Sequence, residues 1–344
     1  MIRVIGFFGV VLMLLSGTLA YARRDEPEQW IAFISDRDGN AEIYRMRPDG
    51  SDVQQLTHTG NNTTHCSVRW SWRGDRIFFT RTPIDPQNKS RSCFGNNPLD
   101  MYEIHFNGSR QHLVKNGFGI LTPDGRWSIV GVFDPNCCSV ILKIDMVTGQ
   151  QVRLAEGSYP QLSPDGQWVA FTDPQQLFLK IVSVETGKVI ELLSSTLFLG
   201  GWPSFGWSPD SQEIIFAGTT LLGNIPTSLY RINIDKRQAL ILKADAGVFD
   251  GMNIALKISP DAKWLAFVDM EQNVPFLKLL SIDTGTITTL TQLNSRNTNI
   301  RSILWAWSSD SQWIIFEQYF QEDNRIHLLR INLDDSTVED LTPI

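Results

Sequence analysis

The sequence has 344 residues, 42% of them hydrophobic, and its 37 acidic residues outnumber 30 basic ones, which gives a net charge of −7. This length predicts either two domains or one large repeat architecture, with enough apolar residues for a core. The negative charge argues against nucleic acid or anionic lipid as the main partner, because both repel an acidic protein.

The first 22 residues differ from the rest of the chain. Met1–Arg3 carry one positive charge, Val4–Leu15 are apolar and uncharged, and small residues follow up to Ala22. This pattern predicts a secretory signal peptide cut after Ala22. An uncleaved membrane anchor is the alternative, because the stretch from Val4 to Ala22 is about long enough to span a bilayer. Either way we expect the body of the protein outside the cytoplasm, periplasmic or secreted, and residues 23–29 to be a linker.

The stretch Tyr159–Leu193 predicts four short strands in succession. They are expected at Tyr159–Leu162, Trp168–Thr172, Leu177–Val184 and Val189–Leu193. The turn Ser163-Pro164-Asp165-Gly166 separates the first two, with a proline that presets φ, an aspartate that can bond back to its backbone and a glycine that accepts positive φ. A sheet this small exposes two apolar faces and therefore needs neighbours.

The same pattern recurs along the chain. The second strand has counterparts in seven places: Trp30–Phe33, Arg76–Phe79, Trp127–Val130, Trp168–Phe171, Glu213–Phe216, Trp264–Phe267 and Trp313–Phe316. From Arg73 onward the third residues of the preceding turns lie 51, 41, 45, 51 and 49 residues apart. Four-stranded units of this length are typical of propeller blades. We predict an all-β, seven-bladed β-propeller of four-stranded antiparallel sheets over residues 30–344; a β-sandwich would not explain a similar turn in each unit.

The first blade is predicted to be incomplete. It begins at its second strand, at Trp30, and the preceding Arg23–Gln29 is too polar to supply the innermost strand. Two alternatives remain: a three-stranded blade, or closure by a strand that the sequence does not identify.

The Ser-Pro-Asp-Gly turn followed by Trp-x-Ala-Phe, together with the run Ser35–Tyr44, resembles the TolB-like propeller repeats. The resemblance covers residues 30–344 and implies the fold rather than one activity, because these repeats serve many roles. The chain departs from TolB in lacking a separate N-terminal α/β domain, in showing seven units rather than six and in lacking a closing C-terminal strand. It also lacks the hydrolase domain of the related peptidases.

Long connections are predicted at one end of the blades. They are Thr82–Leu99, Ser194–Ser204, Gly218–Thr227, Ala244–Met252 and Gln318–Arg325. Bulky aromatic residues in these segments are candidates for contact with a protein, with a glycan as a further possibility: Phe198, Trp202, Phe249, Tyr319 and Phe320. The alternative is that each packs beneath its own loop.

The chain has four cysteines, Cys66, Cys93, Cys137 and Cys138, all at or near these connections. None is in C-x-x-C spacing, which argues against zinc and thioredoxin-type sites. An oxidising compartment favours disulfides, and we expect Cys93 to pair with Cys66 or with one of the adjacent pair.

Two patterns could suggest a metal. Of the five histidines, His58, His65, His105 and His112 fall in the first two repeats and His327 in the last. A resemblance to oligogalacturonate lyases, seven-bladed propellers whose histidines hold a metal, would imply such a site. Because His105 and His112 are placed in outer strands, away from the axis, we expect no metal. Asp36-x-Asp38-x-Asn40-x-Glu42 has calcium-like spacing, but the pattern favours a hairpin turn.

Familiar enzyme motifs such as G-x-S-x-G, a Walker sequence and H-E-x-x-H do not occur. The predicted first strands are apolar, with Arg69, Lys257 and Arg301 as the charges near them. We therefore predict a non-catalytic, extracytoplasmic scaffold that binds a protein partner and uses no cofactor. The alternative is a carbohydrate-active or hydrolytic propeller with its site at the mouth of the central channel.

Overall fold

A computed structural model describes residues 30–342 except 61, 71–74, 85–99, 115–118, 134–138, 174–177, 194–196, 198, 200–204, 221–227, 245–255, 273, 294–304, 309 and 323–324. All regular structure in this part of the chain is β-structure. No helix among the described residues is long and apolar enough to cross a bilayer.

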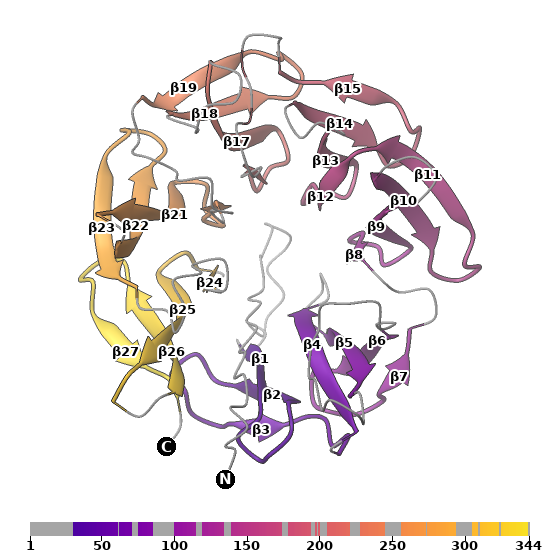
Figure 1. Cartoon of the computed structure of the whole chain (residues 1–344), viewed down its shortest axis with the longest axis vertical. Coiled ribbons are helices and arrows are strands. Elements are labelled where there is room, and N and C mark those ends of the chain that lie inside the picture. Colours follow the sequence, from indigo (N-terminus) through magenta and orange to yellow (C-terminus); the bar gives the residue numbers. More distant parts are fainter. Residues whose placement is uncertain are drawn as a thin grey trace, which may run out of the picture. The chain divides into compact units, whose positions relative to one another are not determined.

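Seven small antiparallel sheets follow one another along the chain, and the fold is that of a seven-bladed β-propeller (Figure 1). Among the described residues the first sheet has three strands and the other six have four each.

The chain divides into two compact units. The first unit holds the first two sheets and the last: β1 (Ile31–Ser35), β2 (Glu42–Met46) and β3 (Gln54–Gln55); β4 (Thr63–Trp70), β5 (Arg76–Pro83), β6 (Asp100–His105) and β7 (His112–Leu113); and β24 (Trp305–Trp307), β25 (Trp313–Phe320), β26 (Arg325–Asn332) and β27 (Val338–Asp340).

The second unit holds the other four sheets: β8 (Ile120–Leu121), β9 (Trp127–Phe133), β10 (Ser139–Asp145) and β11 (Gln151–Glu156); β12 (Ser158–Leu162), β13 (Trp168–Thr172), β14 (Leu179–Ser183) and β15 (Val189–Glu191); β16 (Phe205–Trp207), β17 (Glu213–Gly218), β18 (Ser228–Asn233) and β19 (Ala239–Lys243); and β20 (Lys257–Ile258), β21 (Trp264–Glu271), β22 (Val274–Ser281) and β23 (Ile287–Gln292).

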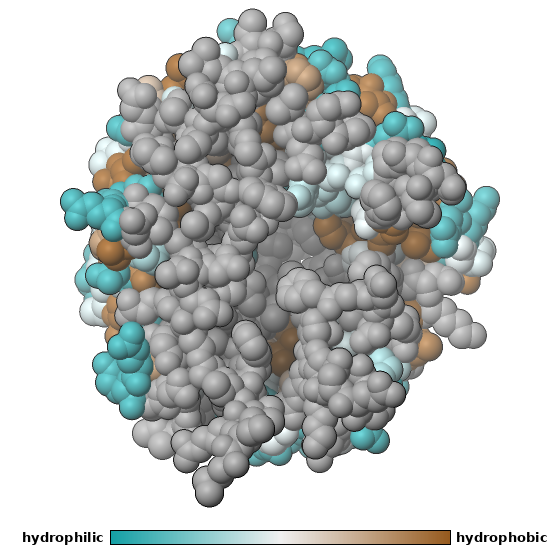
Figure 2. Space-filling view, in the orientation of Figure 1, coloured by the Kyte–Doolittle hydropathy of each residue, from teal (hydrophilic) through white to brown (hydrophobic). Residues whose placement is uncertain are grey.

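The core lies between neighbouring sheets rather than inside any one of them. In β13 the four residues from Val169 to Thr172 are all buried, as expected for a strand covered on both faces. In the first unit, one apolar cluster joins Ile31 and Phe33 to Ile315 and Leu328, so the first and last sheets pack against each other. The surface seen in Figure 2 shows separate hydrophobic areas among polar ones.

The turns between first and second strands repeat one hydrogen-bond pattern. In the fourth sheet the Ser163 hydroxyl donates to Asp165 Oδ1 (2.6 Å) and accepts from the Trp168 amide (2.9 Å). The same pair of bonds is made by the turns that begin at Thr122, Ser208, Ser259 and Ser308. In these five sheets the Ser/Thr-x-Asp turn therefore starts the second strand five residues after its serine or threonine.

Two predicted boundaries are wrong. The first strand of the second sheet begins at Thr63, earlier than the predicted Val68, so Cys66 lies inside β4 rather than before the blade. The segment Gln318–Arg325 is not a long loop, because β25 runs to Phe320 and β26 begins at Arg325. Both strands continue their hydrogen-bonded ladders beyond the residues that the repeat pattern marks.

Candidate functional site

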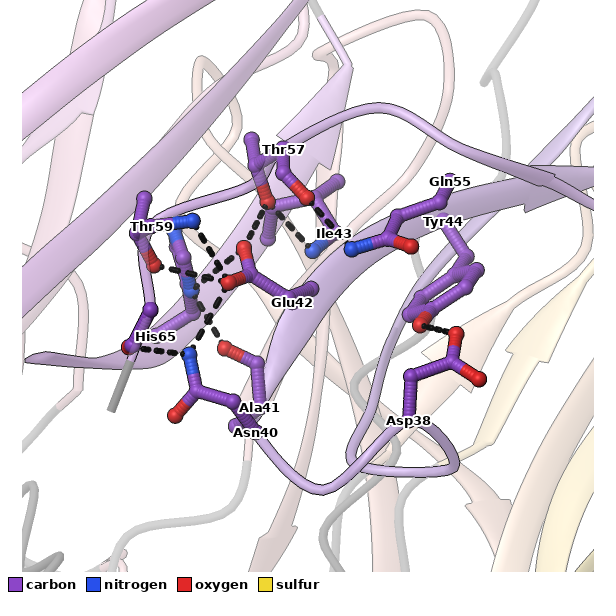
Figure 3. Close-up of polar contacts among 11 residues, drawn as sticks. Asp38, Asn40, Ala41, Glu42, Ile43, Tyr44, Gln55, Thr57, Thr59 and His65 are labelled. Carbon is purple, nitrogen blue, oxygen red and sulfur yellow. Dashed lines mark hydrogen bonds and ion pairs between the residues drawn. The ribbon is translucent and has the colours of Figure 1, made fainter.

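A buried polar cluster lies where the β1–β2 hairpin meets the beginning of the second sheet (Figure 3). Asn40 comes from the hairpin turn, Glu42 is the first residue of β2, and His65 lies in β4. Thr57 and Thr59 come from the connection between β3 and β4. Segments far apart in sequence thus contribute to one cluster inside the first unit.

The Glu42 carboxylate is only 3% exposed and is surrounded by donors. Its Oε2 accepts from the Thr57 hydroxyl (2.6 Å), and its Oε1 accepts from the Thr59 amide (2.7 Å), the Thr59 hydroxyl (2.9 Å) and Asn40 Nδ2 (2.9 Å). Burial acts to raise the pKa of Glu42, but the hydrogen bonds from Thr57, Thr59 and Asn40 outweigh it and leave the pKa below its ordinary value. The group is an ionised acceptor whose oxygens are occupied, which is a poor arrangement for a catalytic base.

His65 lies beside this carboxylate. Its Nδ1 is 2.6 Å from the carbonyl oxygen of Ala41 and 3.9 Å from Glu42 Oε2. Since a carbonyl oxygen only accepts, Nδ1 is assigned the proton. Desolvation is the largest influence on the pKa of His65 and lowers it, so the ring is neutral at pH 7.

Further bonds make the cluster a clamp between two sheets. Thr57 Oγ1 accepts from the Ile43 amide (2.9 Å), and Asn40 Nδ2 donates to the Gly60 carbonyl (2.6 Å). The hairpin turn and the connection to the next blade are therefore fixed by side-chain bonds where the backbone ladder ends. We call the five side chains Asn40, Glu42, Thr57, Thr59 and His65 the Glu42 clamp.

The acidic motif within the clamp is a turn, as predicted. β1 and β2 pair from Ser35↔Glu42 onward, and the Gly39 amide donates to the Asp36 carbonyl (2.8 Å) with φ of +93° at Gly39. The acidic side chains point to different partners, since Asp38 accepts from the Tyr44 hydroxyl and Glu42 accepts from the threonines (Figure 3). Within the described ranges no three His, Cys, Asp or Glu side chains are placed to hold a metal ion.

Trp30, at the start of the first repeat, is a core residue. It is 5% exposed, and the guanidinium carbons of Arg45 and Arg47 lie 3.8 and 4.1 Å from the centroid of its ring. In the last sheet Arg330 covers Trp313 in the same way, at 4.1 Å. Basic residues of the third strand thus cover the tryptophan by cation–π contact.

Two of the five predicted contact residues lie in the described part of the chain. Phe198, Trp202 and Phe249 lie outside the described residues, as do Cys93, Cys137 and Cys138, and the side chain of Cys66 is not described. Tyr319 and Phe320 lie in β25. The Phe320 ring packs on the ring of His327 at 4.5 Å, and the His327 ring bonds to Asp340. Phe320 therefore has a packing role within its own sheet.

Lys257 is a charged residue on an innermost strand, β20. Its side chain reaches solvent, yet protein atoms surround it closely, and this desolvation lowers its pKa to about 8. Near neutral pH an appreciable part of this amine is unprotonated, unlike that of an ordinary surface lysine. The sequence shows that a lysine stands at this position, but the desolvation of its amine depends on packing that no local sequence pattern reveals.

No protein-family model and no curated protein matches this chain. Among solved structures it is similar to an oligogalacturonate lyase in complex with manganese, with a TM-score of 0.68 and 14% identity over 89% of this chain and 86% of that one. An oligogalacturonate lyase from Vibrio parahaemolyticus gives 0.66 and 14% identity over 89% and 87%. A prolyl endopeptidase gives 0.61 and 9% identity over 97% of this chain and 50% of that one.

The TM-scores show a shared β-propeller fold, and identities this low show no shared activity. The likeness to TolB from Acinetobacter baumannii has a TM-score of 0.49 at 16% identity. Membership in the TolB-like repeat family therefore stays a prediction.

Proposed function

We propose that this protein is a non-catalytic, extracytoplasmic scaffold that binds a protein partner through the connections at one end of its sheets. The observation that carries the proposal is an asymmetry of connection lengths. In each four-stranded antiparallel sheet the first–second and third–fourth turns lie at one end, and the second–third turn and the link to the next sheet lie at the other. The turns at the first end are short, for example 163–167, whereas the second end carries segments such as 84–99 and 244–256.

The end of the sheets with the short turns forms a firm frame, because the serine and aspartate side chains of these turns are hydrogen-bonded to each other. Long segments held by a rigid frame are a common way to build a binding surface. Three of the predicted contact residues, Phe198, Trp202 and Phe249, fall in the long segments. The apolar segment before Ala22 supports a location outside the cytoplasm.

Affinity capture with cross-linking from a cell-envelope fraction should identify the partner, whose affinity is then measured with purified proteins. The variant Phe198→Ala/Trp202→Ala/Phe249→Ala should lose binding at least about tenfold, as expected for aromatic anchors. The matched control is Val147→Ala, which changes an apolar residue that is 89% exposed in the β10–β11 turn at the other end. Equal affinity of both variants for the partner, or no partner at all, would overturn the proposal.

A carbohydrate-active role is the second candidate, and Lys257 is the observation that favours it. A lysine with a pKa near 8 on an innermost strand can act as a base. The neighbours of known activity suggest oligogalacturonate as the substrate to test. Product formation should rise with pH through about 8 and be lost in Lys257→Met but kept in Lys263→Met, which changes a lysine 69% exposed in the same sheet. Absence of product in the wild type removes this candidate.

A further inference from the structure

The turn between β6 and β7 carries the sequence Asn107-Gly108-Ser109, with the Asn107 side chain exposed to solvent. The Gly108 amide donates to the His105 carbonyl (2.8 Å), and φ at Gly108 is +84°. This is the geometry of a short hairpin loop with a glycine in the left-handed region. Because glycine has no Cβ, no side chain at position 108 hinders the approach of its backbone nitrogen to the Asn107 side chain.

Three donors meet the side-chain oxygen of Asn107. Its Oδ1 accepts from the Ser109 amide (3.0 Å) and from the Ser109 hydroxyl (2.7 Å), and it lies 2.9 Å from Nδ1 of His105. Because an amide oxygen only accepts, Nδ1 is assigned a proton. Donors gathered on a carbonyl oxygen stabilise the negative charge that this oxygen gains when a nucleophile attacks the carbon.

We propose that Asn107 is a modification site, where the asparagine converts without an enzyme to aspartate and isoaspartate. Local opening of the hairpin end first releases the Gly108 N–H from His105. The Gly108 nitrogen, after losing its proton, attacks Cγ of Asn107, and the charge collects on Oδ1. The donors of Ser109 are two residues away in sequence and move with Asn107 when the hairpin end opens.

The reaction needs only water. The bond between Cγ and Nδ2 of Asn107 breaks, the nitrogen takes up a proton and leaves as ammonia, and a cyclic succinimide remains. Water then opens this ring at either carbonyl, which gives aspartate or isoaspartate. The net reaction consumes one water and releases one ammonia, with no oxidation or reduction.

The first sheet already contains the aspartate form of this turn. In the β2–β3 turn the Ser51 amide (2.9 Å) and hydroxyl (2.6 Å) donate to Asp49 Oδ1, and φ at Gly50 is +83°. The hydrogen bonds from Ser51 lower the pKa of Asp49 below its ordinary value, so this setting favours a carboxylate. An aspartate at position 107 therefore fits its turn as Asp49 fits the turn of the first sheet.

Isoaspartate does not fit in the same way, because the backbone then runs through Cβ and Cγ and is one carbon longer. Two contacts with the first sheet depend on the present path of the turn. Nη1 of Arg45 in β2 donates to the Phe106 carbonyl (2.9 Å), and a Cβ at Gly108 would lie 3.4 Å from Cδ2 of Leu56. The isoaspartate form therefore loosens the join between the first two sheets.

Incubation of the folded full chain, followed by tryptic peptide mapping, tests the reaction. Trypsin cuts after Arg110 and Lys115, which separates Asn107 from the Asn-Gly pair at 116–117, outside the described residues. Asn107 should convert progressively, and faster in mildly alkaline than in mildly acidic buffer, because the attacking nitrogen must lose its proton. Fragment spectra distinguish the aspartate product from isoaspartate.

Two other asparagines serve as controls in the same digest. The side-chain oxygens of Asn233 and Asn332 also accept backbone amides two residues ahead, from Asp235 and Asp334. They are followed by isoleucine and leucine, whose side chains hinder the attack, so both should stay unconverted. Conversion of Asn107 no faster than that of these two residues would overturn the proposal.

A pair of serine variants tests the role of the donors. Ser109→Ala removes one donor from Oδ1 and should slow the conversion of Asn107 at least about threefold. Ser51→Ala makes the matched change in the turn of Asp49 and should leave the rate at Asn107 unchanged. Equal rates at Asn107 in the two variants would show that the geometry of the turn does not promote the reaction.

Thermal melting tests what the two products do to the fold. Asn107→Asp should melt within about 1 °C of the wild type, because the first sheet holds an aspartate in the same setting. Aged protein that is rich in isoaspartate at position 107, isolated by ion exchange, should melt about 2–4 °C lower. Equal melting of the isoaspartate form and the wild type would overturn the effect on the join between the sheets.

Discussion

Glu42 illustrates how one buried carboxylate can tie a hairpin to the next sheet. Four donors meet its two oxygens, and they come from the β1–β2 turn and from the β3–β4 connection. None of these donors loses its partner while Glu42 is ionised. The clamp is therefore most stable where the carboxylate keeps its charge.

Replacing Glu42 by glutamine should destabilise the protein by about 1–3 kcal/mol at pH 7, because the new amide group presents hydrogens to donors in a buried site. The folded-state pKa of Glu42 is lowered, so its contribution to stability is present above the ordinary value of 4.5 and is lost as pH falls through the folded value. The gap in free energy of unfolding between wild type and Glu42→Gln should thus narrow between pH 7 and a pH well below 4.5.

Urea denaturation at the two pH values measures this gap. Glu185→Gln, which changes an exposed residue in the β14–β15 turn, serves as the control and should stay close to the wild type throughout. A gap that does not depend on pH would mean that Glu42 is not ionised in the folded protein.

The contribution of Lys257 to stability depends on pH in the opposite sense. Its pKa is lowered to about 8 in the folded protein from 10.5, so folding disfavours the protonated amine below about pH 8, and the penalty disappears as pH rises toward 10.5. Lys257→Met should raise the Tm at pH 7, and the gain should shrink by about pH 10. Thermal scans at several pH values check this, with Lys263→Met as the exposed control. A lower Tm for Lys257→Met at pH 7 would show that the charged amine is stabilising.

At the scale of the element, the first–second turns join neighbouring sheets as well as strands. A Cβ built on Gly166, where φ is +75°, would lie 2.4 Å from Cδ of Pro123 in the preceding sheet. Gly187 has nearly the same φ, +71°, but nothing lies within 4 Å of its Cβ position. Alanine substitution at the two positions therefore separates the cost of a left-handed backbone from the cost of the contact between sheets.

Gly187→Ala should cost about 1–2 kcal/mol, which is the price of a left-handed conformation for an L-residue. Gly166→Ala should cost this amount and more, since Pro123 or the turn must also move. Denaturation of the two variants under the same conditions gives the difference directly. Equal losses would mean that the sheets separate at this point without cost.

Sequence reasoning predicted the elements well because their signals are local. The turn chemistry and the alternation of apolar residues placed β13 at Trp168–Thr172, as the structure has it. The turn reading of Asp36–Glu42 is confirmed for the same reason.

The Glu42 clamp could not be predicted in this way. Its partners Thr57, Thr59 and His65 follow Glu42 at distances set by the fold, and no periodic pattern marks them. The extension of β4 and β25 beyond the repeat also escaped prediction, because those residues gain strand structure from pairing rather than from their own alternation.

At the scale of the whole molecule, the first and last sheets meet although their residues are far apart in sequence. Arg330 Nη1 donates to the carbonyl of Pro48 (2.7 Å) across 282 positions of the chain, and Arg330 also pairs with Glu339 and covers Trp313. Contacts of such separation form late in folding, because a long loop must close first.

Arg330→Met should therefore cost about 1–2 kcal/mol, mostly through the lost bond to Pro48. Lys263→Met, whose ion pair with Asp261 is exposed, should cost less than about 0.5 kcal/mol. Equilibrium denaturation gives both values, and limited proteolysis of Arg330→Met should show earlier cutting near the two ends of the chain. Unchanged proteolysis and stability would assign the contact no role in joining the sheets.

The β10–β11 turn has a practical consequence. Asp145 accepts the amides of Val147 and Thr148, and Gly149 takes φ of +75°, so the turn holds its shape while Val147 projects into solvent. A short biotin-acceptor sequence inserted there would anchor the protein to a sensor chip in one orientation. The other end of the same sheet, where the connection from β9 to β10 lies, would then be turned away from the chip, as a search for partners of that end requires.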